Sequence, residues 1–133
     1  PKACIDVSKI EKAVNSKFIN YINGKWSSSI GDLIIQINGE DHKNFIVIEN
    51  LDGKKSNQKY EIQNISNING ILGVMNLNVC SSSVPCTKEN FIPIQINKIF
   101  GKDKTIAISY DSRITYCIDS EDNCTRAFKR IID

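Results

Sequence analysis

The sequence contains a single histidine, His42, and lacks the motifs that mark the common classes of enzyme. It has no glycine-rich loop that would cradle a phosphate, no G-x-S-x-G nucleophile elbow and no H-E-x-x-H helix. His42 lies in the stretch GEDHKN, a predicted turn between polar residues, where a histidine is more often a surface residue than a catalytic one. We therefore expect a protein that is not an enzyme and that needs no cofactor.

Acidic residues form two small groups, and neither has the spacing of a metal site. Glu40 and Asp41 lie in one predicted turn, and the second group is Asp119, Glu121 and Asp122. Turns favour such residues because their carboxylates hydrogen-bond the local backbone. A calcium loop needs alternating acidic residues and a downstream glutamate, and DSEDNC does not continue in that way. We expect no metal site.

The chain has no long apolar run and no block of like charge. A membrane-spanning helix needs roughly 18 apolar residues in a row, so no integral membrane segment is expected. The net charge is +2, and charges of both signs are spread along the chain. The densest basic cluster is Arg126, Lys129 and Arg130, which is typical of a solvated face. Because the tyrosines alternate with apolar neighbours rather than with basic residues, we expect no nucleic-acid binding.

Five cysteines define two short loops and leave one cysteine over. Cys80 and Cys86 bracket SSSVP, and Cys117 and Cys124 bracket IDSEDN. Both spacings suit a disulfide that closes a loop of turn-forming residues, whereas zinc sites have closer cysteine pairs with histidines nearby. Two such bridges predict a secreted or periplasmic protein. Because the opening residues PKACIDVSK do not have the pattern of a signal peptide, we expect that one has been removed. Cys4 can be a free thiol, part of another connectivity or an intermolecular bridge.

Residues 8–22 have the pattern of an amphipathic helix. Ser8 is placed to cap its N-terminus, and Glu11 is placed to complete a capping box. Apolar residues recur at steps of four, at Ile10, Val14, Phe18 and Ile22. Asn23 and Gly24 follow as a stop signal, because glycine adopts the left-handed conformation at low cost.

After Trp26 the apolar period changes to two, which is typical of β-strands. The expected strands are 32–38, 44–50, 58–68, 71–80, 91–100, 105–110, 113–118 and 124–132, the last of which also fits a short helix. Pro93 predicts an edge or a bulge. Short strands at regular spacing with Gly, Asn and Asp turns favour an antiparallel barrel or sandwich. We expect one domain over residues 1–133, with the helix at about 8–22 and a β-barrel at about 26–131.

The stretch Gly-Lys-Trp, at the change from helical to strand period, resembles the G-x-W signature of the lipocalin and fatty-acid-binding (calycin) proteins. The resemblance implies a mainly β, antiparallel lipocalin-like barrel of about eight strands, preceded by one N-terminal amphipathic helix. It also implies that Gly24 and Trp26 close the barrel, with an arginine across the indole. Arg126 or Arg130 matches that arginine, and Arg113 is a weaker match. The family's second signature, T-D-Y, has no counterpart, so the resemblance does not identify a ligand.

Two functions fit these features. The first is a binding protein of the inhibitor, immunity or host-interaction type, whose stapled loops contact a protein partner, because rigid loops lose little entropy on binding. The candidate loop residues are Ser81, Ser82, Ser83, Val84, Pro85, Asp119, Glu121 and Asp122. The alternative is a carrier of a small apolar ligand in the barrel interior. Bulky inward isoleucines argue against a carrier, because they tend to fill a barrel.

Overall fold

The computed structural model describes residues 6–28, 31–38, 40–51, 54–81, 84–101, 104–109 and 125–131. Only the backbone is described at 48–51, 54–58 and 125–127. The elements are α1 (Val7–Ile22), β1 (Gly24–Ser28), β2 (Gly31–Ile37), β3 (Asn44–Leu51), β4 (Lys54–Asn69), β5 (Val74–Ser81), the 3₁₀-helix η1 (Lys88–Asn90), β6 (Ile92–Lys98), β7 (Thr105–Ser109) and β8 (Thr125–Arg130).

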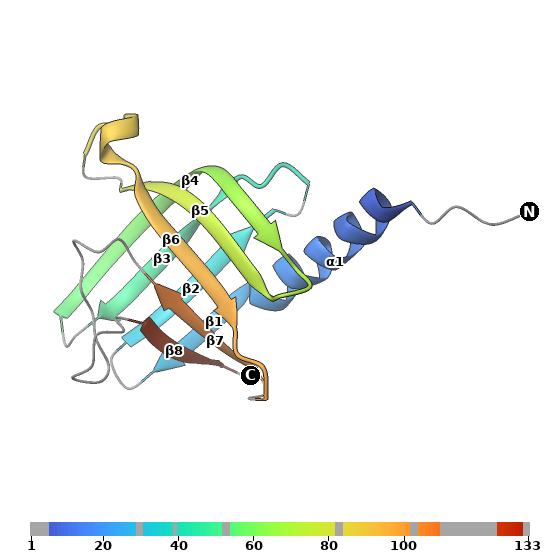
Figure 1. The fold of residues 1–133 in the computed structure, drawn as a ribbon. Coiled ribbons are helices and arrows are strands. Elements are labelled where there is room, and N and C mark those ends of the chain that lie inside the picture. Colours follow the sequence, from blue (N-terminus) through green and yellow to red (C-terminus); the bar gives the residue numbers. More distant parts are fainter. Residues whose placement is uncertain are drawn as a thin grey trace, which may run out of the picture.

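The strands form one closed antiparallel barrel with α1 at one end (Figure 1). Each strand pairs with the next along the chain, and β1 pairs with β8 to close the sheet, with Trp26 opposite Arg130. Closure leaves no free sheet edge along the β1–β8 seam. The predicted fold class is confirmed: a mainly β, eight-stranded antiparallel barrel preceded by one N-terminal helix.

Two strand assignments differ from the prediction. Trp26 lies within β1, which forms a hairpin with β2, so the first strand is GKWSS rather than the isoleucine-rich segment that follows. A strand with one apolar residue has no readable period of two, which is why the pattern missed it. The strand predicted at 71–80 begins only at Val74, because Ile71 and Leu72 lie in the β4–β5 turn. The C-terminal stretch, for which strand and short helix were both open, is strand β8. The strand predicted at 113–118 lies outside the described residues.

Pro93 lies within β6, opposite Asn78 of β5. The described pairing of β6 with β7 begins only at Gln95. The missing N–H of Pro93 therefore removes no hydrogen bond from the described β6–β7 ladder, and the side chain is exposed. The residues that would follow Ser109 opposite Pro93 lie outside the described part of the chain, so the predicted edge or bulge stays a prediction.

The helix begins one residue earlier than predicted, because Asp6 rather than Ser8 is its N-cap. The Asp6 carboxylate accepts hydrogen bonds from the Ser8 hydroxyl at 2.6 Å and from the Ser8 backbone N–H at 3.1 Å. The Ser8 hydroxyl is the main cause of a lowered pKa for the Asp6 carboxyl. Aspartate and serine both accept hydrogen bonds from the free N–H groups of a first turn, so either residue fits the capping pattern. The observed cap, Asp6, lies two residues before the predicted one, Ser8.

Only the C-terminal half of α1 enters the barrel end. Phe18, Ile19 and Ile22 are buried, whereas Ile10, predicted on the same apolar stripe, is 47% exposed. The N-terminal end of the helix projects beyond the barrel (Figure 1), whereas Glu11 and Val14 lie beside the end of β4 and the β4–β5 turn. Amphipathic spacing therefore identified the helix correctly, but it marked a longer buried face than the barrel end covers.

The barrel interior is filled by one cluster of buried apolar side chains. Its members are Phe18, Ile19, Ile22, Trp26, Leu33, Ile35, Ile37, Ile46, Tyr60, Ile62, Met75, Leu77, Val79, Ile94, Ile96, Ile106, Ile108 and Phe128. The alternation predicted for the isoleucine-rich strands thus points these residues inward. Most of these side chains are branched or aromatic, and residues of α1 and of the strands belong to the same core.

Strands β3 and β4 diverge toward the helix end of the barrel. Their pairing ends at Phe45 opposite Glu61, but β4 continues to Asn69 in partnership with β5. The β4–β5 register shifts between Ile62 and Asn64 and again between Ile65 and Asn67. Such bulges bend a strand and increase its twist, so β4 turns away from β3 where the bulges begin.

Candidate functional site

The closed end of the barrel is centred on Trp26, which is completely buried. Its indole Nε1 donates a hydrogen bond of 2.8 Å to the backbone oxygen of Ile22, at the end of α1. The guanidinium carbon of Arg130 lies 4.4 Å from the indole centroid. A cation at this distance is attracted by the negative face of the ring. The indole is thus fixed between the helix and the last strand.

Arg130 also binds the C-terminal end of α1. Its Nη1 donates to the Asn23 backbone oxygen at 2.7 Å, and its Nη2 donates to the Tyr21 backbone oxygen. The carbonyls at the end of a helix have no partner within the helix and carry partial negative charge. One guanidinium therefore caps α1 and covers Trp26.

Glycine is required at position 24 for a reason other than the predicted helix stop. Asn23, with φ of −66°, is the C-cap, and Gly24 already belongs to β1 with φ of +129°. A Cβ at Gly24 would lie 2.5 Å from Nη1 of Arg130. Glycine is needed because the guanidinium passes directly over its backbone. The alternative arginines from the sequence, Arg126 and Arg113, have side chains outside the described residues.

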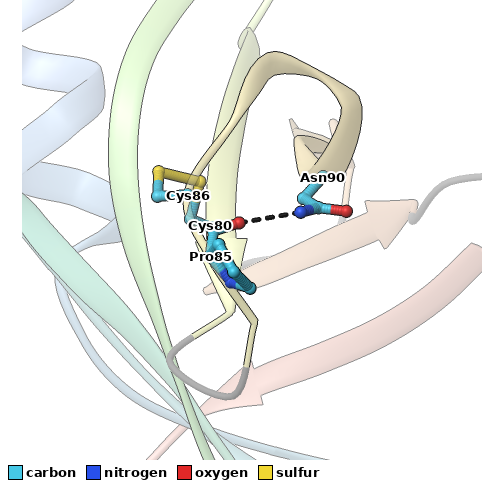
Figure 2. The surroundings of a disulfide bond; sticks show 4 residues. All are labelled: Cys80, Pro85, Cys86 and Asn90. Carbon is cyan, nitrogen blue, oxygen red and sulfur yellow. Dashed lines mark hydrogen bonds between the residues drawn. A yellow bond between two sulfur atoms is a disulfide. The ribbon is translucent and has the colours of Figure 1, made fainter.

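The first predicted disulfide is confirmed. Cys80, at the end of β5, is bonded to Cys86 with a Cα–Cα distance of 5.5 Å. The backbone oxygen of Pro85 accepts from the Asn90 side-chain amide at 2.8 Å (Figure 2). It also accepts from the Thr87 N–H at 3.1 Å. The connection from β5 to β6, which includes η1, is thus fixed by the disulfide and by these hydrogen bonds. We call residues 80–86 the stapled loop.

The stapled loop presents an apolar side chain to solvent. Val84 is 44% exposed and Pro85 is exposed, whereas Ser81 is half-buried at the end of β5. An exposed valine on a cross-linked loop is a preorganised contact, because little entropy remains to be lost on binding. The predicted loop residues Ser82 and Ser83 lie outside the described residues.

The second predicted loop cannot be placed. Its cysteines and acidic residues all lie outside the described part of the chain: Cys117, Asp119, Glu121, Asp122 and Cys124. Cys4 also lies outside it. The disulfide predicted there and the contribution of that loop to binding stay predictions.

Beside the stapled loop lies an open groove of about 960 Å³. It lies where β3 and β4 diverge, between the β2–β3 turn and the loop, and its lining reaches the core residues Tyr60 and Ile62. Its lining residues are Asp41, His42, Lys43, Asn44, Phe45, Lys59, Tyr60, Glu61, Ile62, Gln63, Asn64, Ile65, Cys80, Ser81, Val84 and Cys86. We call this hollow the fork groove.

The fork groove has a mixed apolar and charged lining. Phe45 is half-buried, and Nζ of Lys59 lies 5.7 Å from the centroid of its ring. Glu61 follows on the same strand and is exposed. His42 is half-buried in the turn at one wall, with a left-handed φ of 55°. Apolar patches with charges of both signs at the rim match the composition of protein–protein interfaces.

Sequence reasoning missed this groove and the position of His42 in its wall. The groove depends on the bulges of β4, and the stretch QKYEIQNISNI gave only a weak alternation that did not show where they fall. Asparagine-rich strands supply few apolar markers, so a register shift leaves little trace in the pattern.

Within the described ranges no group of three or more His, Cys, Asp or Glu residues is placed to hold a metal ion. The described helices include none that is both long enough and apolar enough to cross a membrane. Comparison of the chain with protein-family models, with curated proteins and with solved structures finds no match. The function is therefore argued from the geometry of the surface.

Replacing Cys80 and Cys86 together by serine is expected to lower the free energy of unfolding by about 2 kcal/mol, because a short loop is no longer closed in the unfolded chain. Urea unfolding measures this change, with Val84→Ala as the control that keeps the bridge. Alkylation of the unreduced wild-type protein, followed by mass spectrometry, should leave both cysteines unmodified. Labelling of either cysteine would show that the bridge is absent in solution.

Proposed function

We propose that this protein is a non-enzymatic binding protein that recognises a protein partner through the stapled loop and the fork groove. The observation that carries the proposal is their adjacency: Val84 of the loop and Phe45 of β3 line the same groove. A disulfide-fixed apolar residue beside an open groove offers an anchor and a receiving surface together.

The shape and lining of the groove favour a polypeptide over a small apolar ligand. The groove is open to solvent, and its lining combines charged residues such as Lys59 and Glu61 with apolar ones. A small apolar ligand is normally enclosed by largely apolar walls. An extended polypeptide instead offers alternating side chains and backbone groups that match such a mixed surface.

The compartment and the family resemblance belong to the same proposal. The Cys80–Cys86 disulfide supports an oxidising compartment, so the protein acts outside the cytosol, as a secreted or periplasmic factor. The barrel order, the helix at its closed end and the contact of Arg130 with Trp26 support a lipocalin-like architecture. This architecture fits inhibitor, immunity and host-interaction roles, because loops on a rigid barrel can vary without loss of the fold.

The test is retention of a partner by the immobilised protein from the extracellular or envelope proteins of its source. Lys59→Glu and Val84→Glu change exposed side chains at two points of the groove, so the fold should persist. We expect each to reduce retention of the partner at least about tenfold, as interface anchors do. Leu72→Ser, an exposed residue at the other end of the barrel, should retain the partner fully.

If both groove variants retain the partner as well as the wild-type protein does, the fork groove is not the binding surface. Failure of the wild-type protein to retain any partner specifically would remove the proposed function itself. Urea midpoints of all variants, equal to that of the wild type, establish that lost retention reflects the surface rather than unfolding.

A second candidate function is carriage of a small apolar ligand, and one feature of the barrel favours it. At the end of the barrel away from α1, the inward positions two residues beyond Trp26, Leu33 and Val79 hold small residues. They are Ser28 of β1, Gly31 of β2 and Ser81 of β5. Small side chains at these positions fill less of the barrel interior than the isoleucines of the core do. Saturable binding of a fluorescent fatty-acid probe that Ser81→Phe abolishes, and that Val84→Glu leaves unchanged, would support the carrier. Absence of saturable binding would exclude it.

A further inference from the structure

Exposed apolar side chains are concentrated at the helix end of the barrel. Seven large apolar residues are exposed among the described ones, and Val84 of the stapled loop lies away from this end. The other six belong to α1, to the β4–β5 and β6–β7 turns and to the end of β8. They are Val7, Ile10, Ile71, Leu72, Phe100 and Ile131. We call the first five of these six the apolar cap, whose exposed fractions range from 47 to 67%.

The parts of the apolar cap adjoin one another. The Gly70 N–H donates to the Asn15 side-chain oxygen at 3.0 Å, so the β4–β5 turn is attached to α1. Val14 of α1 and Ile71 of the turn line one groove of about 330 Å³. At the other side of the turn, the Lys98 N–H donates to the Gly73 oxygen at 2.7 Å.

Phe100 completes this surface at the β6–β7 turn. A Cβ on Gly73 would lie 3.3 Å from the ring of Phe100, so the ring lies against the β4–β5 turn. Leu72, beside Gly73, is 61% exposed, and Phe100 is 64% exposed. The two turns therefore present neighbouring apolar side chains rather than separate ones.

Along α1 the cap continues as a stripe. Val7, Ile10 and Val14 are three and four residues apart, which places them on one helix face. Val7 and Ile10 are exposed and Val14 is half-buried beside the turn. Val7 and Ile10 thus form an exposed apolar stripe at the start of α1, which Val14 joins to the β4–β5 turn.

Lysines outnumber acidic residues on the elements that carry the apolar cap. Nζ of Lys98 lies 5.8 Å from the Phe100 centroid and 4.6 Å from the Tyr21 centroid. The described lysines of α1, the end of β6 and the β6–β7 turn are Lys9, Lys12, Lys17, Lys98 and Lys104. The described acidic residues of α1 and its cap are Asp6 and Glu11. Lys9 and Lys12 lie on the polar face of α1. Lys17, Lys98 and Lys104 lie beside the cap and form its basic rim, to which Glu11 adds one negative charge.

We propose that the apolar cap docks on the surface of an anionic lipid bilayer, with α1 lying in the interface. Apolar side chains of an interfacial helix and of loop tips enter the boundary between headgroups and acyl chains, while lysines bind anionic headgroups. The long stems of lysines let their charges reach the headgroups from beside an apolar surface. A second copy of the chain is a poorer occupant, because two identical faces would bring their lysines together.

The test is co-sedimentation of the full chain with vesicles of phosphatidylcholine alone and of equal parts phosphatidylcholine and phosphatidylglycerol. We expect binding to the anionic vesicles only. The triple variant Ile71→Ser, Leu72→Ser and Phe100→Ser should lower the partition coefficient at least about tenfold, because three apolar anchors are removed. Val84→Ser, an exposed apolar residue outside the cap, is the matched control and should bind as the wild type does.

The charge contribution is measured with Lys17→Gln and Lys104→Asn together. Asparagine suits position 104 because Lys104 has a left-handed φ of 51°. We expect this pair to lower binding to anionic vesicles severalfold. Equal binding by the triple variant and the wild type, or no binding of the wild type to anionic vesicles, overturns the proposal. So does self-association that the triple variant abolishes without any vesicle binding, since the cap would then cover a second copy.

Discussion

Replacing Arg130 by methionine is expected to lower the free energy of unfolding by about 3 kcal/mol. The variant loses two charge-assisted hydrogen bonds to the carbonyls of Asn23 and Tyr21, each contributing about 1.5–3 kcal/mol. It also loses the cation over Trp26, which contributes about 0.5–2 kcal/mol. The sum is reduced because methionine still covers the indole and because water can reach the freed carbonyls. Urea unfolding followed by the fluorescence of Trp26 measures the change.

Lys129→Met is the matched control for Arg130→Met. Lys129 is the preceding residue of β8, carries the same charge and is exposed. Its replacement should change the free energy of unfolding by no more than about 0.5 kcal/mol, as is usual for surface residues. Equal effects of the two variants would show that Arg130 acts through net charge alone and that it does not hold the barrel end together.

Replacing Gly24 by alanine is expected to cost about 3 kcal/mol. The backbone at φ of +129° is strained for any residue with a Cβ, at about 1–3 kcal/mol. In addition, the new Cβ would lie 2.5 Å from Nη1 of Arg130 and would displace the guanidinium from the helix end. Gly101→Ala is the control, because Gly101 has φ of +85° but no atom within 4 Å of an added Cβ. That variant should cost only about 1–2 kcal/mol.

The two replacements are expected to be coupled. In the Arg130→Met background, Gly24→Ala should cost clearly less than in the wild-type protein, because the guanidinium that meets the new Cβ is gone. Additive effects would mean that the backbone conformation of Gly24 alone explains the glycine. A double-mutant cycle by urea unfolding separates these two cases.

The sequence contained enough information for the barrel and for its closed end. Strict alternation in segments such as DLIIQIN and VMNLNV identified the inward residues, because a strand buried on one face leaves a period of two. The change of period at Trp26 marked the point where the helix ends and the barrel begins. The spacing of Cys80 and Cys86 identified the disulfide, since turn-forming residues between them allow the chain to return.

The two surfaces proposed for binding were not predictable in the same way. Ile71 and Leu72 were assigned to a strand by their apolar character, whereas they form an exposed turn before Val74. Only the folded chain brings that turn beside Val14 of α1 and Phe100 of the next turn. Likewise, the basic rim is assembled from lysines that are far apart in the sequence, so no charge block indicated it.

Hydrogen–deuterium exchange of the protein with and without its retained partner tests the central claim most directly. The account predicts slower exchange of backbone amides at residues 41–45 and 59–65 and at Val84 and Cys86, which line the fork groove. It predicts unchanged exchange in the first two turns of α1 and at residues 70–73. Protection confined to the helix end, or absent from the fork groove and the stapled loop, would contradict it.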